Sequence, residues 1–397
     1  MSLIDREHRH FLQTYKRLPV EVDRAEGMYV YAADGTRYLD FLGGIAVNAL
    51  GHSHPKVNAA IERQIRRYTH LSNYFYQDAQ VEFVEKLCAA SGYDRAFLTN
   101  SGTEATEGAI KLARAHGSPN GKHEIIGLSG GFHGRSYGAL SIMDKPRYKD
   151  GMGPFLPGTS VIPFNDVEAL RAAVNRQTAA VVVEFLQGEG GIHWTTPEFV
   201  TALFELREEH GFLVVGDEIQ AGGGRTGRFL SFERFGVRPD IVTIAKGLGG
   251  GLPLGAILAT ESLAHIWGSG QHGTTFGGNA VSCVAGSTVI DELMGGVMEH
   301  ARAMGEILLD ELRALAGEFP ELVSEVRGAG AIAGLELTVP AGPLVDAMLA
   351  KRVIANATSD TVIRLLPPMI FEREHITEAI GTLRECFQEW YSATPTI

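Results

Sequence analysis

Residues 241–251 read IVTIAKGLGGG, an apolar run that ends in a single lysine, Lys246, before a loop rich in glycine. The β-branched residues of the run favour a buried strand. The glycines that follow allow another molecule to approach the backbone closely. An amine delivered to that place could bond covalently to an aldehyde cofactor. Taken alone, the stretch favours a simpler interpretation, a strand that ends in a solvated lysine, so the rest of the chain has to decide.

Further apolar, β-branched runs precede this one, and segments with helical spacing separate several of them. The runs lie at 96–99, 124–128, 160–163, 180–185 and 212–217, and the helical patterns include 103–115 and 197–210. Wholly apolar strands that alternate with helices predict an α/β fold with a mostly parallel, mixed sheet covered by helices. Ligands bind such sheets at the carboxyl ends of the strands. Lys246, Asp217 and Glu184 all fall at or next to those ends.

The two ends of the chain have a different pattern of predicted helices and strands. Residues 28–42 predict a hairpin around the turn Ala33-Asp34-Gly35. After about residue 290, helical spacing alternates with short strands at 331–337 and 362–366. We therefore expect a large domain over 56–290 and a smaller α+β domain over 291–397, with the N-terminal segment 1–55 packing against the smaller one.

Composition and charge exclude several classes of partner. The chain has 397 residues, a formal net charge of −12 and no long basic run, so we expect neither nucleic acid nor a membrane as partner. The three scattered cysteines and a charged N-terminus without an apolar signal core favour a cytoplasmic protein. His52 and His54 lack a third residue at ligand spacing, so no metal site is expected.

Asp217 ends an apolar run, where a carboxylate needs a partner. A structural arginine and a protonated ring nitrogen are both suitable partners. With Lys246 in the same sheet, the pair fits pyridoxal 5'-phosphate, which needs a lysine for a covalent bond and an acid for its ring nitrogen. Lys246, once displaced by an incoming amine, could then move the substrate's proton.

Other segments fit such a site less specifically. Residues 100–104, NSGTE, lie between a strand and a helix, where free N–H groups could bind a phosphate or simply be capped. Phe132 and Arg135 could stack on a ring and bind a carboxylate, or be a core and a surface residue. GGGRTG at 222–227 matches GxGxxG, but no convincing helix follows, so a dinucleotide site lacks its required context.

Nine motifs, in order, resemble the class III aminotransferases, which are pyridoxal-phosphate enzymes of fold type I. They are FLGGIAVNALGHSHP, SGTEATE, GFHGRS, PFND, EFLQGEGG, DEIQAGGGRTG, AKGLGGGLPLGA, HGTTFGGN and RLLPP. The resemblance runs from about residue 18 to about residue 368, nearly the whole chain. The resemblance implies fold type I, pyridoxal 5'-phosphate as cofactor and a homodimer with shared active sites.

The family pattern also implies a role for each matching residue. Lys246 would form the covalent bond to the cofactor, and Asp217 would pair with its ring nitrogen. The remaining cofactor contacts would be Phe132 stacked on the ring, Glu184 beside it, Gln220 near the phenolic oxygen, and Ser101, Gly102 and Thr103 on the phosphate. Thr275 would reach the phosphate of the neighbouring subunit.

The implied substrate contacts are Tyr15, Ile45, Arg135, Glu189 and Arg364. Arg135 would bind the α-carboxylate. Glu189 would mask Arg364 while the amino donor is bound, and release it when 2-oxoglutarate brings a second carboxylate. Ile45 stands where the family's ornithine δ-aminotransferases have tyrosine, and an apolar residue there suits a donor whose α-amino group carries an acyl cap.

Within the family the chain is most similar to the enzymes that act on N2-acetyl-L-ornithine. We therefore expect transfer of its terminal amino group to 2-oxoglutarate in arginine biosynthesis. Alternative donors are 4-aminobutyrate, succinylornithine and carrier-linked lysine precursors. A mutase or racemase, or a non-catalytic binding protein, are alternatives from other classes. Phe185 and Thr106 replace the family's frequent proline and asparagine, and Phe185 could reshape the wall beside the cofactor.

Overall fold

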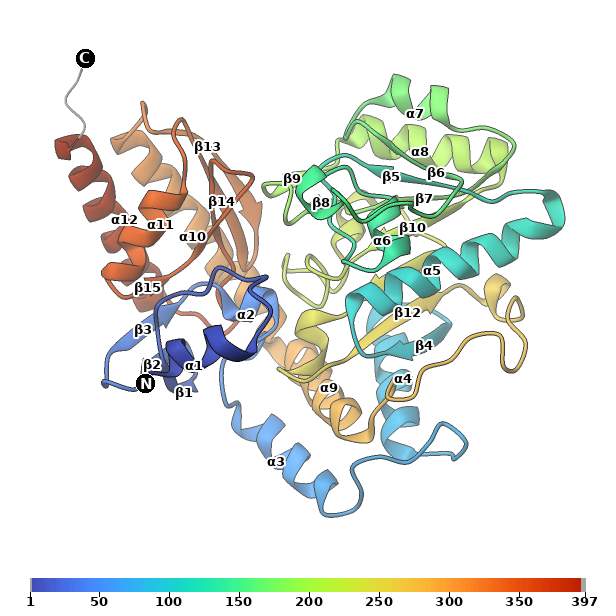
Figure 1. Cartoon of the computed structure of the whole chain (residues 1–397), viewed down its shortest axis with the longest axis horizontal. Coiled ribbons are helices and arrows are strands. Elements are labelled where there is room, and N and C mark those ends of the chain that lie inside the picture. Colours follow the sequence, from blue (N-terminus) through green and yellow to red (C-terminus); the bar gives the residue numbers. More distant parts are fainter. Residues whose placement is uncertain (1, 394–397) are drawn as a thin grey trace.

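The computed structural model describes residues 2–393, which fold around one large and three smaller β-sheets (Figure 1). The large sheet has the strand order β4-β12-β11-β10-β7-β5-β6. Its strands are β4 (Arg95–Thr99), β12 (Gly255–Ala259), β11 (Ile241–Ile244), β10 (Leu213–Asp217), β7 (Thr178–Val183), β5 (Glu124–Leu128) and β6 (Thr159–Ile162). All run in one direction except β12, which is antiparallel to both its neighbours. The predicted α/β fold with a mostly parallel, mixed sheet is therefore confirmed.

Both faces of the large sheet are covered, and this explains why its strands are apolar throughout. Every residue of β7 is buried. Because successive side chains of a strand point to opposite faces, Ala180 and Val182 join a core with helix α5 (Gly102–Gly117). Val181 and Val183 join the opposite core, which includes helix α8 (Pro197–His210).

Two of the three smaller sheets are built from the ends of the chain, and one of them combines strands from both ends. One contains β1 (Val22–Glu26), β2 (Tyr29–Ala32), β3 (Arg37–Asp40) and β15 (Val353–Ile354), and β3 pairs with β15 in parallel. The other contains β13 (Val323–Ala329), β14 (Ile332–Leu337), β17 (Val362–Leu365) and β16 (Asn356–Thr358). Helices α10 (Met298–Glu318), α11 (Gly342–Ala350) and α12 (Arg373–Ala393) lie beside them (Figure 1). The domain boundaries at 55/56 and 290/291 stay a prediction.

Helix α9 (Ala280–Glu292) links the two regions, because it continues through a π-helical turn (Leu293–Val297) into α10. The combined helix Ala280–Glu318 is long and apolar enough to cross a membrane by length and composition. However, α9 packs against α3 (Pro55–Ile65) and α4 (Asp78–Ser91) and buries Cys283 and Val289. Its apolar side chains are those of a core helix.

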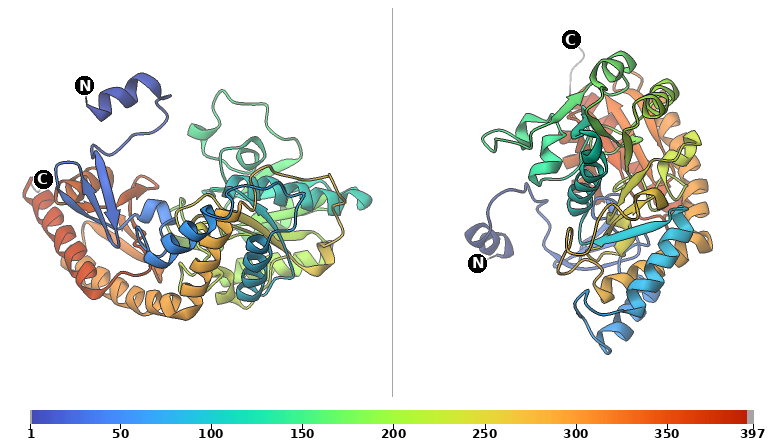
Figure 2. Two further views of the ribbon diagram at one scale, coloured as in Figure 1. Left: turned by 90° about the horizontal axis from the view of Figure 1, so that it is seen from below. Right: turned by 90° about the vertical axis from the view of Figure 1, so that its right-hand side faces the viewer.

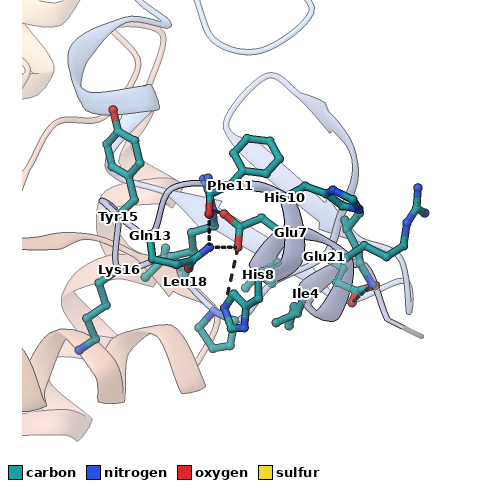
Figure 3. A pocket seen from close by; sticks show the side chains of 15 residues that line it. Ile4, Glu7, His8, His10, Phe11, Gln13, Tyr15, Lys16, Leu18 and Glu21 are labelled. Carbon is teal, nitrogen blue, oxygen red and sulfur yellow. Dashed lines mark hydrogen bonds and ion pairs between the residues drawn. The ribbon is translucent and has the colours of Figure 1, made fainter.

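Shorter elements complete the chain. They are α2 (Gly43–Ala46), α6 (Tyr137–Ser141), α7 (Val167–Ala173) and the hairpin of β8 (Leu186–Gln187) and β9 (His193–Trp194). The N-terminal segment stands apart: helix α1 (Leu3–His10) has no buried residue and projects from the body of the molecule (Figure 2). Side chains of residues 3–21 line an open pocket of about 790 Å³ (Figure 3).

The packing of α10 on the β13–β14 turn gives a stability prediction. A Cβ at Gly305 would lie 2.2 Å from the carbonyl oxygen of Gly330. Gly305→Ala should therefore lower the free energy of unfolding by about 1–3 kcal/mol through overpacking. An added Cβ at Gly381 in α12 would have no neighbour within 4 Å outside its own stretch of helix. Gly381→Ala should therefore raise the free energy of unfolding by about 0.5–1 kcal/mol through helix propensity. Urea unfolding of both variants measures the two changes in the free energy of unfolding. Equal changes in the two variants would contradict the close packing described at Gly305.

Candidate active site

Three neighbouring strands of the large sheet deliver the central residues. Lys246 begins a 3-10 turn (Lys246–Gly249) directly after β11, and its backbone is held at φ 45°. Asp217 is the last residue of β10, where it lies level with Thr243 of β11. Glu184 follows β7, the next strand over. The carboxyl ends of these parallel strands therefore place the amine and both carboxylates in one region, as the sequence led us to expect.

The surroundings of Lys246 favour its neutral amine. Burial lowers the pKa of Lys246, the charge of Arg364 adds to this, and the opposing charges of Glu189, Asp217 and Glu184 do not cancel it. A neutral amine is the form that attacks an aldehyde. The environment therefore suits a lysine that acts as a nucleophile.

Asp217 has a histidine partner that the sequence reading missed. Nδ1 of His133 lies 2.7 Å from Oδ2 of Asp217, and both side chains are buried. Burial opposes charge on the ring, yet the hydrogen bond and charge of Asp217 raise the pKa of His133 overall. The backbone N–H of Ile219 donates to the other oxygen, Oδ1, at 3.0 Å. Among the described residues no arginine pairs with Asp217, so the structural-arginine alternative is wrong.

Glu184 is buried close to this pair. Its carboxylate accepts the backbone N–H groups of Phe132 at 2.9 Å and Gly188 at 3.3 Å. Burial nevertheless raises the pKa of Glu184 to about 7. This carboxyl can therefore hold a proton near neutral pH.

Phe132 and Tyr148 line a cavity of about 400 Å³, and Arg135 lies against both of their rings. The guanidinium of Arg135 lies 3.7 Å from the ring centroid of Tyr148 and 5.6 Å from that of Phe132. The two rings pack edge to face at 5.9 Å. Arg135 is exposed and is held by aromatic faces, so it remains available to a carboxylate. Tyr148 carried no signal in the sequence that distinguished it from an ordinary surface tyrosine.

The N-terminus of α5 forms a cradle for an anion. Ser101 caps the helix by accepting the N–H of Glu104 at 3.3 Å. At Gly102 a Cβ would lie 2.8 Å from the side chain of Ile219, so only glycine fits. Thr103 Oγ1 lies 2.7 Å from Oγ of Ser136, a further hydroxyl that the sequence did not indicate. Helix N-termini of this kind bind phosphate through free N–H groups and the helix dipole.

Thr275 does not join this cradle within the single chain. It is exposed, and the threonine that contacts the α5 region is its neighbour Thr274, which accepts from Nδ2 of Asn100 at 3.1 Å. Tyr15 is 75% exposed and lies in the projecting N-terminal segment, where Figure 3 shows its ring turned outward. The described chain therefore leaves both residues outside the group around Lys246.

Glu189 and Arg364 form an ion pair in which Arg364 is buried and Glu189 is partly exposed. Oε1 of Glu189 lies 2.6 Å from Nη1 of Arg364, whose residue is 1% exposed. Burial opposes ionisation, but the charge and hydrogen bond of Arg364 lower the pKa of Glu189 overall. Gln220 bridges the pair, because its Nε2 donates to Glu189 at 3.2 Å and its Oε1 accepts from Arg364 at 2.9 Å.

Two further residues have clear positions in the structure. Ile45 is 43% exposed at φ 62°, an unusual value for a β-branched residue, and its helix α2 packs against the turn that begins at Lys246. Phe185 is fully buried against Phe232 and Phe235. The ring of Phe185 belongs to the core, and its effect on the wall beside a cofactor stays a prediction.

The alternative binding motifs are not supported by the described residues. The segment 222–227 is a series of turns followed by a 3-10 helix (Ser231–Phe235), so the GxGxxG pattern opens no α-helix. Within residues 2–393 no group of three histidine, cysteine or acidic residues could hold a metal ion. In contrast, the amine, the held carboxylate and the anion cradle together fit the aldehyde, the ring nitrogen and the phosphate of pyridoxal 5'-phosphate.

Comparison with known proteins agrees with this geometry. The family model "Aminotransferase class-III" matches residues 11–387. An acetylornithine aminotransferase from Methanocaldococcus jannaschii is 45% identical over 394 residues, which cover 97% of this chain and 98% of the relative. The solved acetylornithine aminotransferase from Elizabethkingia anophelis has a TM-score of 0.87 at 32% identity, covering 97% of this chain and 98% of its own. An ornithine aminotransferase from Toxoplasma gondii has a TM-score of 0.93 at 29% identity, covering 98% and 95%. The chain belongs to the class III aminotransferase family, which depends on pyridoxal phosphate.

Proposed function

We propose that the protein transfers the terminal amino group of N2-acetyl-L-ornithine to 2-oxoglutarate, giving N-acetyl-L-glutamate 5-semialdehyde and L-glutamate. The ion pair of Glu189 with the buried Arg364, close to Lys246, is the observation that carries this proposal. Curated acetylornithine aminotransferases at 39–45% identity over nearly the full chain support the donor. This reaction belongs to arginine biosynthesis, and we place the enzyme in the cytoplasm.

Pyridoxal 5'-phosphate, when bound, supplies an aldehyde that can take up an amino group and release it again, and a ring that withdraws electrons. Lys246 would hold that aldehyde and, once the donor has displaced it, would move the proton at the carbon that bears the amino group. Asp217, held by His133 and the Ile219 N–H, would keep a proton on the ring nitrogen. The N-terminus of α5 would hold the phosphate.

The paired Glu189 and Arg364 let one pocket accept two different substrates in turn. N2-acetylornithine presents a neutral acetamide and one carboxylate, for which Arg135 is the partner. With that donor bound, Arg364 needs its own counter-charge, and Glu189 supplies it. 2-Oxoglutarate has a second carboxylate that competes with Glu189 for the guanidinium.

Ile45 supports an acyl-capped donor. A free α-ammonium would lose a hydrogen-bonding partner against an apolar side chain, and such a loss costs about 1–3 kcal/mol. A capped α-nitrogen carries no charge and avoids this cost. The partial exposure of Ile45, next to the turn of Lys246, is consistent with a surface that a substrate covers.

We also propose that the enzyme acts as a homodimer. Large apolar side chains of segment 71–76 are exposed, among them Tyr74 at 94% and Tyr76 at 105%. This segment lies against 273–278, because Asn73 donates to the carbonyl oxygens of Thr274 and Gly277. Thr275 is on the same surface, so a second copy packed there would receive it. Exposed aromatic patches of this kind mark interfaces.

The amino donor can be identified from the first half-reaction. Purified holoenzyme is mixed with N2-acetylornithine, ornithine, N-succinylornithine or 4-aminobutyrate, and the loss of the cofactor's visible absorption band is timed. N2-acetylornithine should react fastest, with kcat/KM about tenfold or more above ornithine, because Ile45 offers an ammonium no partner. A faster reaction with ornithine, succinylornithine or 4-aminobutyrate would reject the proposed donor.

A pair of variants tests the reason for that preference. Ile45→Tyr should raise kcat/KM for ornithine relative to N2-acetylornithine, because its hydroxyl can accept from the ammonium. Ile45→Phe is the matched control, since it adds the ring without the hydroxyl and should leave the preference unchanged. The same gain in both variants would show that size, and not hydrogen bonding, decides.

The dimer can be tested by placing charge in the exposed patch. Tyr74→Glu combined with Phe75→Glu should give a monomer that has lost activity, since Thr275 no longer reaches a second site. Met294→Glu, at an exposed apolar position outside the patch, should remain a dimer. Sedimentation equilibrium measures the mass in each case, and an active monomeric wild-type enzyme would refute the shared site.

A further inference from the structure

The switch residue Glu189 lies at the tip of the β8–β9 hairpin, between Gly188 and the pair Gly190 and Gly191. Glycine imposes little backbone preference, so such a tip has no strong conformation of its own. Yet Oε1 of Glu189 is held 2.6 Å from Nη1 of Arg364. The restraint must therefore come from outside the hairpin.

Side chains of the C-terminal sheet provide that restraint by binding backbone carbonyl groups. Thr358 Oγ1 donates to the carbonyl oxygen of Glu189 at 2.7 Å, and Ser359 Oγ lies 3.2 Å from the same atom. Nε and Nη2 of Arg327 both donate to the carbonyl oxygen of Gly191, at 3.1 and 2.7 Å. The carbonyl of Gly188 accepts from Arg364 itself at 3.1 Å.

Arg327 is built to hold its guanidinium in this orientation. Its side chain is 8% exposed, and its charge is balanced by Glu325 at 2.5 Å and Glu336 at 2.7 Å. Both carboxylates belong to the same sheet, on β13 and β14. With the charge balanced there, the planar donor group points across to the hairpin tip with a fixed geometry.

We propose that Arg327 and Thr358 are positioning residues that set how strongly Glu189 masks Arg364. They fix the backbone of 188–191, so that only the side chain of Glu189 moves when a dicarboxylate arrives. This inference rests on the proposed function of the Glu189–Arg364 pair. Freeing the backbone weakens the mask, and therefore makes dicarboxylate substrates bind better relative to the amino donor.

The test compares two half-reactions in the same holoenzyme, one with N2-acetylornithine and one with glutamate as donor. Arg327→Gln and Thr358→Val should each raise the ratio of kcat/KM for glutamate to that for N2-acetylornithine by about three- to tenfold. Arg327→Lys keeps the positive charge and one donor nitrogen, so its ratio should lie much closer to the wild-type ratio than that of Arg327→Gln. Glu321→Gln removes an exposed carboxylate just before β13 that, among the described residues, has no hydrogen bond or ion pair with Arg327 or the hairpin, and it should leave the ratio unchanged.

Glu189→Ala serves as the reference, because it removes the mask entirely and should raise the ratio most. If Glu189→Ala raises the ratio while Arg327→Gln and Thr358→Val do not, the positioning role is wrong and the proposed function stands. Equal losses in both half-reactions would show a merely structural role and also overturn the inference. If Glu189→Ala leaves the ratio unchanged, the switch itself fails, and the positioning role fails with it.

Discussion

A lysine amine enclosed by protein is the constraint on which the site depends. Burial favours the neutral form of Lys246, whereas the charges of Glu189, Asp217 and Glu184 favour the protonated form. The balance falls on the side of a lowered pKa, which keeps a reactive amine available. Each neighbouring carboxylate then needs a partner of its own, and each has one: His133 for Asp217, Arg364 for Glu189 and two backbone N–H groups for Glu184.

These partners come from distant parts of the chain, so the site needs both the large sheet and the C-terminal sheet. The large sheet supplies Lys246, Asp217 and Glu184 at adjacent strand ends. The C-terminal sheet supplies Arg364 from β17, and the same sheet holds the tip of the hairpin that carries Glu189. The Glu189–Arg364 pair, which we propose selects between substrates, is thus made between the two regions, while Lys246, Asp217 and Glu184, which we propose bind the cofactor, belong to one.

The sequence predicted the elements better than the contacts. Strands that are buried on both faces appear in the sequence as continuous apolar runs. Six of the seven strands of the large sheet, β11 among them, were therefore predicted close to their observed bounds. Strand β12 (Gly255–Ala259) was missed because its short GAILA run follows a glycine-rich loop and carries little β-branching. Asp217 and Lys246 stood out because charged residues at the ends of apolar runs are rare. His133 lies 84 residues from Asp217, and Arg327 lies 136 from Gly191. Such pairings leave no local pattern in a single sequence, because only the folded chain creates them.

The most direct test is to locate the covalent bond itself. The holoenzyme is reduced with borohydride, digested, and its peptides are mapped by tandem mass spectrometry. We expect a single pyridoxyl group on the side-chain nitrogen of Lys246, and none after Lys246→Ala. A pyridoxyl group on a different lysine, or a wild-type enzyme that is active yet carries no such group after reduction, would contradict it.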